Sequence, residues 1–298
     1  MTRDSLILFA SILGVVFFVA ALEGLVFALY KRKYDWRAYF ATFGLLVGRE
    51  GLKVVPFSLC IPILGWLWQH RLYTMPLSKA WALAFLIVGQ DFSYYWMHRA
   101  SHRIRWFWTS HVPHHSSNQL NFATAIRLGW TMDPSGQTLF YAPLVCLGFS
   151  PQTVITAAGV ALAYQLWIHT TWIPKLGWLE KILNTPSHHR VHHAINPEYL
   201  DRNYGGIFII FDRLFGTMAV ERPDVPCRYG IIMPLNSYNP VKIALHEWAA
   251  LGRDLFRAGS WRERLSYLVG LPGWRPNGLS TTSDDLRRAA LAEARSGA

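Results

Sequence analysis

Histidines in short clusters are the residues of this sequence most able to carry chemistry. Three clusters, which read HRASH, HVPHH and HHRVHH, occupy residues 98–102, 111–115 and 188–193. Residues three or four positions apart share one face of a helix, so each cluster can present at least two imidazoles to one metal ion. Imidazole is a ligand for iron, copper, zinc and nickel. Three such clusters in one chain predict a metal centre rather than chance surface histidines.

The number of histidines predicts two metal ions, because the clusters and the isolated His169 hold more ring nitrogens than one ion can bind. In the third cluster, either of the first two histidines can join the site. His188 with His192 repeats the spacing of the first cluster, whereas His189 repeats the spacing of the second. We favour His189, because adjacent helical residues are about 100° apart and His188 is turned from the face that His189 begins.

The overall composition is that of a folded, apolar chain. Of 298 residues, 52% are hydrophobic and only 16% are charged, against about 25% in an ordinary soluble protein. This balance excludes a disordered chain, a coiled coil and a collagen-like repeat. The three cysteines form no CxxC pair, which argues against a disulfide scaffold and a thiolate zinc module. The net charge of +11, with the apolar content, favours a membrane partner over nucleic acid.

Long apolar stretches predict that the chain crosses a bilayer several times. Leu6–Leu29 contains a single charged residue and is long enough to span at about 1.5 Å per residue. A cleaved signal peptide is the alternative, but its apolar region would be shorter. Ala80–Met97 is a second span. Residues 134–174 contain no Asp, Glu, Lys or Arg and are long enough for two passes that turn near Pro151.

Charge and proline placement complete the expected fold. Residues 38–68 are apolar but carry charges near position 50, and Pro56 and Pro62 predict a kinked or two-piece segment. The basic stretches 31–37 and 99–105 predict that these loops, and with them the histidine clusters, lie on the cytoplasmic side. The expected fold class is therefore all-α, an integral membrane helical bundle with a histidine-rich two-metal site on its cytoplasmic side.

The chain divides into three expected parts. Residues 1–79 form N-terminal membrane spans, residues 80–220 a histidine-bearing domain that includes a membrane hairpin, and residues 221–298 a basic amphipathic region with a polar tail. Pro240–Arg257 places apolar residues at helical spacing, and that face is expected to lie on the membrane surface. Ser280–Ala298 is expected to be loosely held.

The sequence around the clusters carries further motifs, namely DFSYYWMH, NTPSHHRVHH, NYGG and DRLFGT, which end at His98, His193, Gly206 and Thr217. With these motifs, residues 80–218 resemble the membrane fatty acid hydroxylase/sterol desaturase superfamily, in particular its alkylglycerol monooxygenase-like branch. The resemblance implies a helical membrane protein whose domain over residues 80–220 holds a non-haem di-iron centre. By position, it implies nine metal ligands: His98, His102, His111, His114, His115, His169, His189, His192 and His193.

Three polar residues near the clusters are expected to support catalysis. Asp91 lies two helical turns before His98 and can orient a ligand through its second ring nitrogen, or form an ion pair with an arginine. Gln165 stands where some relatives of the resembled family carry a histidine, and its amide oxygen can take that place. Asn196 is a candidate of the same kind as Asp91. Tyr94 belongs to an aromatic run that is typical of a membrane interface.

The resemblance implies an oxidoreductase that uses O₂ to hydroxylate a C–H bond of a lipid, with two Fe²⁺ ions as cofactors. The expected substrate is a membrane lipid such as a glycerol ether or an acyl lipid, and electrons would come from a donor protein or a soluble reductant such as a pterin. The alternatives are a lipid or sterol desaturase of the same superfamily and a non-catalytic metal-binding membrane protein. We expect the chain in the cytoplasmic membrane of a bacterium, with no nucleic acid partner. Nothing in the sequence predicts the oligomeric state.

Overall fold

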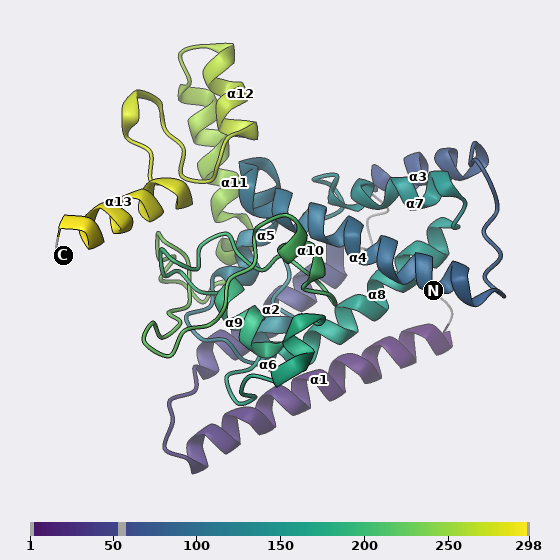
Figure 1. Cartoon of the computed structure of the whole chain (residues 1–298), viewed down its shortest axis with the longest axis horizontal. Coiled ribbons are helices and arrows are strands. Elements are labelled where there is room, and N and C mark those ends of the chain that lie inside the picture. Colours follow the sequence, from purple (N-terminus) through teal and green to yellow (C-terminus); the bar gives the residue numbers. More distant parts are fainter. Residues whose placement is uncertain (1–2, 53–57, 297–298) are drawn as a thin grey trace.

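The computed structural model describes residues 3–52 and 58–296, and the regular elements within them are all helices (Figure 1). Two isolated β-bridges join Leu183 to Phe208 and Ala194 to Tyr229. The expected all-α class is therefore confirmed for these residues. The α-helices in chain order are α1 (Arg3–Leu29), α2 (Trp36–Leu52), α3 (Cys60–Gln69), α4 (Ala80–Arg103), α5 (Arg105–His115), α6 (Phe122–Ala125), α7 (Ala142–Leu147), α8 (Pro151–Ile168), α9 (Pro186–His192), α10 (Ile210–Leu214), α11 (Pro240–Arg257), α12 (Trp261–Val269) and α13 (Ser283–Ser296). The 3₁₀ helices are η1 (Gln137–Tyr141), η2 (Gly177–Lys181) and η3 (Pro276–Gly278).

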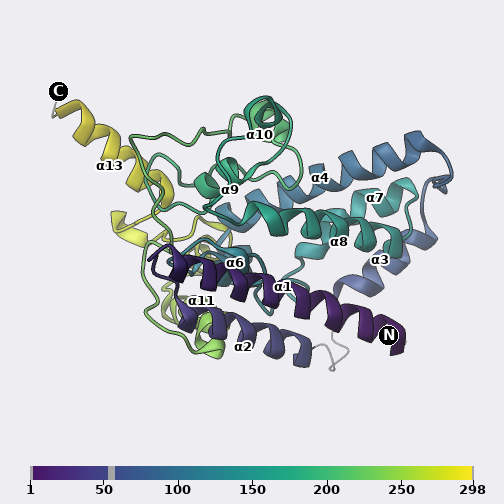
Figure 2. The same ribbon diagram turned by 90° about the horizontal axis from the view of Figure 1, so that it is seen from below.

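Helix α4 is the element around which the others are arranged. It packs against α5, α8 and η1, while α11 packs against α2 and α5. Figure 2 shows α8 between α4 and α1, and in both overall views α13 projects from the end of the molecule remote from the start of α1. The histidine-bearing ends of α4, α5, α8 and α9 thus meet in the middle of the molecule.

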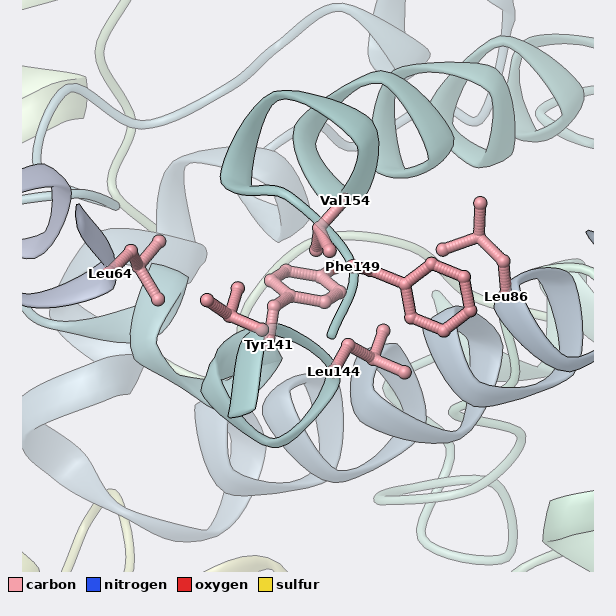
Figure 3. Close-up of a cluster of buried hydrophobic side chains, with 7 residues drawn as sticks. Leu64, Leu86, Tyr141, Leu144, Phe149 and Val154 are labelled. Carbon is pink, nitrogen blue, oxygen red and sulfur yellow. The ribbon is translucent and has the colours of Figure 1, made fainter. Parts of the chain in front are cut away.

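A buried hydrophobic cluster fixes the opposite end of α4 against α3, α7 and α8 (Figure 3). Its members are Leu64, Leu86, Tyr141, Leu144, Val145, Phe149 and Val154. Helix α8 begins at a clear local signal, because the Ser150 side chain accepts a hydrogen bond from the Thr153 N–H and Pro151 occupies the first turn. The cluster and this cap together direct α8 so that it ends at His169, beside the other histidines.

The expected membrane spans are not confirmed. Within residues 3–52 and 58–296, no helix combines the length and the apolar character needed to cross a bilayer. Leu6–Leu29 and Ala80–Met97 are nevertheless helical, as parts of α1 and α4. The prediction of two passes over residues 134–174 is not confirmed either, and the first of the two stretches is not one continuous helix. Gly136 and Gly148 adopt positive φ angles of 88° and 113°, which interrupts the helix on both sides of η1 and α7.

The segment expected to be kinked or in two pieces forms two helices, α2 and α3, which confirms that prediction. Pro62 lies inside α3, near its beginning, where the missing N–H of a proline breaks no helical hydrogen bond. Pro56 lies outside the described residues.

Two expectations for the last part of the chain are wrong. Helix α11 has the predicted bounds, but its apolar face packs inside the protein, where Ala244 lies against residues of α2 and Leu251 against α12. The polar tail is not loose, because it forms α13 and the Asp284 carboxylate accepts two hydrogen bonds from Arg103 at 2.9 and 2.7 Å. The apolar residues of an amphipathic helix have the same spacing whether the helix packs against lipid or against protein. The spacing alone therefore does not predict which of the two covers the apolar face.

Candidate metal centre

Four helix ends position the histidines. The last turns of α4 carry His98 and His102, and the chain turns at Ile104, whose extended backbone (φ −124°, ψ 118°) ends α4 and begins α5. Helix α5 therefore packs back against α4 and brings the second cluster to face the first. Helix α9 carries the third cluster, and His169 is the residue that follows the last turn of α8.

The nine histidines expected from the sequence come together in two adjacent groups. In each group, one ring nitrogen of every member lies within 4.8 Å of the corresponding nitrogens of the others. The first group, of five, is His98, His102, His111, His115 and His192. The second group, of four, is His114, His169, His189 and His193. His188 belongs to neither group, since its Nδ1 faces the Thr185 N–H at 3.4 Å at the start of α9.

The ring nitrogens are arranged to fit cations. His98 donates from Nδ1 to the Tyr204 carbonyl oxygen at 2.8 Å, so its Nε2 carries a lone pair when the ring is neutral. That Nε2 lies 3.0 Å from Nε2 of His111. His169 is arranged in the same way. Its Nδ1 donates to the Gln165 carbonyl at 2.6 Å, and its Nε2 lies 2.8 Å from Nε2 of His189. Lone pairs that converge in this way repel one another unless a cation or proton lies between them.

Burial reinforces this interpretation. Desolvation, followed by repulsion from neighbouring imidazoles, holds the pKa of His111, His115 and His193 well below the usual value of 6.5. Burial also lowers the pKa of His169 to about 4. These imidazoles are neutral at pH 7, which is the form that binds metal ions. In the described part of the chain, the buried Nε2 atom of His192 has no hydrogen-bond partner, as expected of a nitrogen reserved for a metal.

The three residues expected to support catalysis have different roles. Within residues 3–52 and 58–296, the Asp91 carboxylate contacts neither a histidine ring nor an arginine. It accepts from the backbone N–H groups of Ile207 and Phe208 at 2.7 and 2.9 Å, and its expected part in catalysis stays a prediction. The Asn196 side chain also bonds to backbone groups: its Nδ2 donates to the Pro226 carbonyl, and its Oδ1 accepts from the Arg228 N–H. Both side chains fix loops near the histidines.

Gln165 lies next to the metal centre without joining either group. Its Oε1 accepts a hydrogen bond from the Tyr94 hydroxyl at 2.8 Å, and its buried Nε2 has no partner in the described residues. The Tyr94 ring lies 5.1 Å from that of His98, and the expectation of an interfacial aromatic run stays a prediction. The loop packs closely against these side chains at Gly206, since a Cβ at this residue would meet Asp91 at 2.6 Å and Tyr94 at 2.9 Å. Only glycine allows the loop to approach so closely.

An apolar groove of about 490 Å³ lies between α4 and α8 and leads toward Gly206. The α4 wall is formed by Leu83, Ile87 and Gln90, which continue along the helix to Tyr94 and His98 at intervals of three or four residues. The α8 wall includes Val160, on the same helix as Gln165, and Ile207 lies at the inner end beside Gly206. The volume is in the range of about 300–1,000 Å³ that is typical of small-molecule sites.

Sequence reasoning quoted Asn203 and Tyr204 in the NYGG motif, but it did not predict that residues 201–204 contact the histidines. The backbone carbonyls of Arg202 and Tyr204 accept hydrogen bonds from His192 and His98, and the Asp201 carboxylate faces His102. Carbonyl oxygens leave no signal in a sequence. The Asp201 carboxylate, two residues before the NYGG motif, is the charged residue that could have been flagged.

Comparison with known proteins identifies the domain that holds these groups. The fatty acid hydroxylase family profile matches residues 83–217. Human alkylglycerol monooxygenase is 37% identical over 212 residues, which are 71% of this chain and 47% of that protein. The ornithine lipid hydroxylase OlsE of Rhizobium tropici is 31% identical over 142 residues, 46% of this chain and 43% of that protein.

A more distant relative extends the comparison to desaturases. The Delta(7)-sterol 5(6)-desaturase ERG3B of Gibberella zeae is 28% identical over 142 residues, 47% of this chain and 42% of that protein. The chain spans about half the length of these relatives. No solved structure matches it.

Proposed function

Because the chain belongs to the fatty acid hydroxylase family through residues 83–217, we propose that it is a membrane-bound, O₂-dependent hydroxylase of lipids. In this proposal two Fe²⁺ ions are held by the nine histidines, one ion in the group of five and one in the group of four. The observation that carries it is the convergence of nine ring nitrogens, most of them buried, in two adjacent groups.

The protein's part in the chemistry follows from the surroundings of the two groups. Two bound ferrous ions would supply the reduction of O₂ and the removal of hydrogen from an unactivated C–H bond. The neutral imidazoles present lone pairs, and their buried setting keeps bulk water away. Tyr94 is bonded to Gln165 beside the histidines, and the Gln165 Nε2, which has no partner among the described residues, is available to donate a hydrogen bond to a substrate oxygen.

The groove supports a lipid substrate. Its walls are almost entirely apolar, and it runs along the α4 face that ends at His98. We propose that it holds the alkyl chain of a glycerol ether or an acyl lipid. Relatives named for alkylglycerols and for ornithine lipid, both at more than 30% identity, support this substrate class.

Contact with a membrane is part of the proposal. Large apolar side chains on α1 and α4 are exposed, among them Phe18 (68%), Leu25 (57%) and Trp81 (56%), and such surfaces are unusual on a protein that meets only water. The basic stretches 31–37 and 99–105 favour the cytoplasmic side for the histidines. Electrons would come from a donor protein or a soluble reductant such as a pterin.

The proposal is tested by metal content and oxygen consumption of the purified protein. Wild type should bind two iron ions per chain and consume O₂ with a reductant and an alkylglycerol or acyl lipid. His115→Ala and His193→Ala should each lose iron and activity. His246→Ala should behave as wild type, since within the described part of the chain that ring bonds only to the Ile243 carbonyl of its own helix. Wild-type iron and turnover in either of the first two variants would contradict the proposal.

Analysis of the product separates hydroxylation from desaturation. A product one oxygen atom heavier, or its cleavage products, indicates hydroxylation, whereas a product lighter by two hydrogens indicates a desaturase like the sterol relative. Iron binding without O₂ consumption for any lipid offered would instead favour a non-catalytic metal protein.

A further inference from the structure

One short loop supplies hydrogen-bond acceptors to two of the five histidines in the first group and places a carboxylate beside a third. His98 donates from Nδ1 to the Tyr204 carbonyl at 2.8 Å, and His192 donates to the Arg202 carbonyl at 2.9 Å. His102 Nδ1 lies 3.6 Å from Oδ1 of Asp201. Acceptors of this kind set the tautomer and the direction of a metal-binding imidazole. We call residues 201–204 the acceptor loop.

Two residues of the acceptor loop have a left-handed backbone. Asp201 and Asn203 have φ angles of 56° and 55°, a region that aspartate and asparagine enter more readily than other residues with a Cβ. Asn203 is held by its side chain, which donates to the His188 and Ala219 carbonyls. The Asp212 carboxylate accepts from the Tyr204 N–H. These contacts hold the loop in this conformation.

The second group has much less support of this kind. Among the described residues, His169 donates to the Gln165 carbonyl on its own helix, and no ring of this group bonds to the acceptor loop. The buried Nδ1 atoms of His114 and His189 have no partner within residues 3–52 and 58–296. The two groups therefore differ in how firmly their rings are oriented.

Helix α13 supports the acceptor loop from outside. Arg103, the residue after His102, donates to Oδ2 of Asp201 at 2.9 Å and forms two hydrogen bonds with Asp284 in the first turn of α13. The Ser283 hydroxyl also donates to Asp201. Figures 1 and 2 show α13 extending away from the rest of the molecule beyond these contacts. Its first turn is thus tied, through Arg103 and Asp201, to a histidine of the first group.

We propose that α13 is a clamp that selectively strengthens metal binding by the five-histidine group, acting through Ser283 and Asp284, Arg103, Asp201 and His102. The four-histidine group, which shares none of these contacts, exchanges its ion independently of α13. This inference rests on the proposed two-metal centre. Ser283, Asp284 and Arg103 are positioning residues, because they touch no ring in either group.

The test follows metal release rather than turnover. The full chain in detergent is loaded with Co²⁺, and ions per chain, visible spectrum and rate of transfer to EDTA are measured. Wild type should hold two ions. In the double variant Ser283→Ala/Asp284→Ala, one ion should leave at least about tenfold faster, as for other residues that orient metal ligands, and the second at the wild-type rate. Asp284→Glu should largely restore slow release.

Arg288→Ala is the matched control, because Arg288 pairs with Asp285 on the exposed side of the same helix. It should release both ions as wild type does. Adding His193→Ala to the double variant identifies the affected ion. The protein should then hold a single ion, in the five-histidine group, and this ion should be released at the accelerated rate. If the double variant does not fold, the single variant Ser283→Ala removes the α13 hydroxyl that donates to Asp201 and must show the same selective release to a smaller extent.

The outcomes separate the clamp from the proposed function. Two ions in wild type with unchanged release in the folded variants, or equal acceleration of both ions, would overturn the clamp alone. Wild-type protein that binds fewer than two ions would overturn the proposed metal centre, and the clamp with it.

Discussion

Replacing Asp91 by asparagine tests whether this carboxylate holds the glycine-containing loop beside the metal centre. The Asp91 carboxylate is fully buried and accepts from Ile207 and Phe208 N–H groups at 2.7 and 2.9 Å. A hydrogen bond to a charged group contributes about 1.5–3 kcal/mol. Asparagine keeps one acceptor oxygen but turns an NH₂ group toward the other N–H. We therefore expect Asp91→Asn to lose about one such bond, or ~2 kcal/mol of the free energy of unfolding.

The assay is thermal unfolding together with metal content, both in detergent. A loss of that size lowers Tm by roughly 3–6 °C in a chain of this size. Because the loop leads directly into Tyr204, the variant should also hold metal less tightly at the group that contains His98. Asp224→Asn is the control, since it makes the same change of charge in an exposed pair with Arg222 and should alter neither quantity.

Two results would refute the reasoning in different ways. Wild-type Tm and metal content in Asp91→Asn would show that the carboxylate does not anchor the loop. Loss of metal with an unchanged Tm would instead support the role expected from the sequence, in which Asp91 acts on a ligand histidine and not on the backbone.

Three further predictions concern the groove, an ion pair and the third histidine cluster. Val160→Trp should narrow the groove and lower turnover of long-chain lipids several-fold without changing metal content. Val241→Trp, at an exposed site on α11, is the control and should leave turnover unchanged. Equal activity of both variants would argue against binding of the lipid chain in the groove. Glu221→Gln should lower Tm at pH 7, because it removes the paired hydrogen bonds with Arg190 at 2.7 Å. Burial alone would raise the pKa of Glu221, but the hydrogen bonds from Arg190 lower this pKa from its usual 4.5. The stability that the Glu221 carboxylate contributes is therefore present above about pH 4.5 and is lost as the pH falls through the folded-state pKa. A Tm difference between variant and wild type that persists at lower pH would contradict this. His188→Ala should retain the metal content of wild type, since that ring lies outside both groups, and loss of an ion would place it among the ligands.

The identity of the histidines that meet could be predicted because the controlling geometry is local. Spacings of three and four residues place His98 with His102, and His189 with His193, on one helix face whatever the rest of the fold does. Motifs around the clusters then indicated how distant clusters combine, and all nine expected histidines do converge. The bounds of α11 were predictable for the same reason, since proline and asparagine at its start and its apolar period are local signals.

What these elements pack against was decided only by the tertiary structure. The apolar face of α11 buries Leu251 inside the protein, and the supposed loose tail is held by a contact between Arg103 and Asp284, 181 residues apart. The acceptors that orient His98 and His192 are backbone carbonyls, which every residue possesses and no sequence pattern distinguishes. Residue type and spacing therefore determined which side chains can bind a metal. The partners that aim them arise from long-range packing, because a hydrogen-bond acceptor is selected by where the folded chain places it.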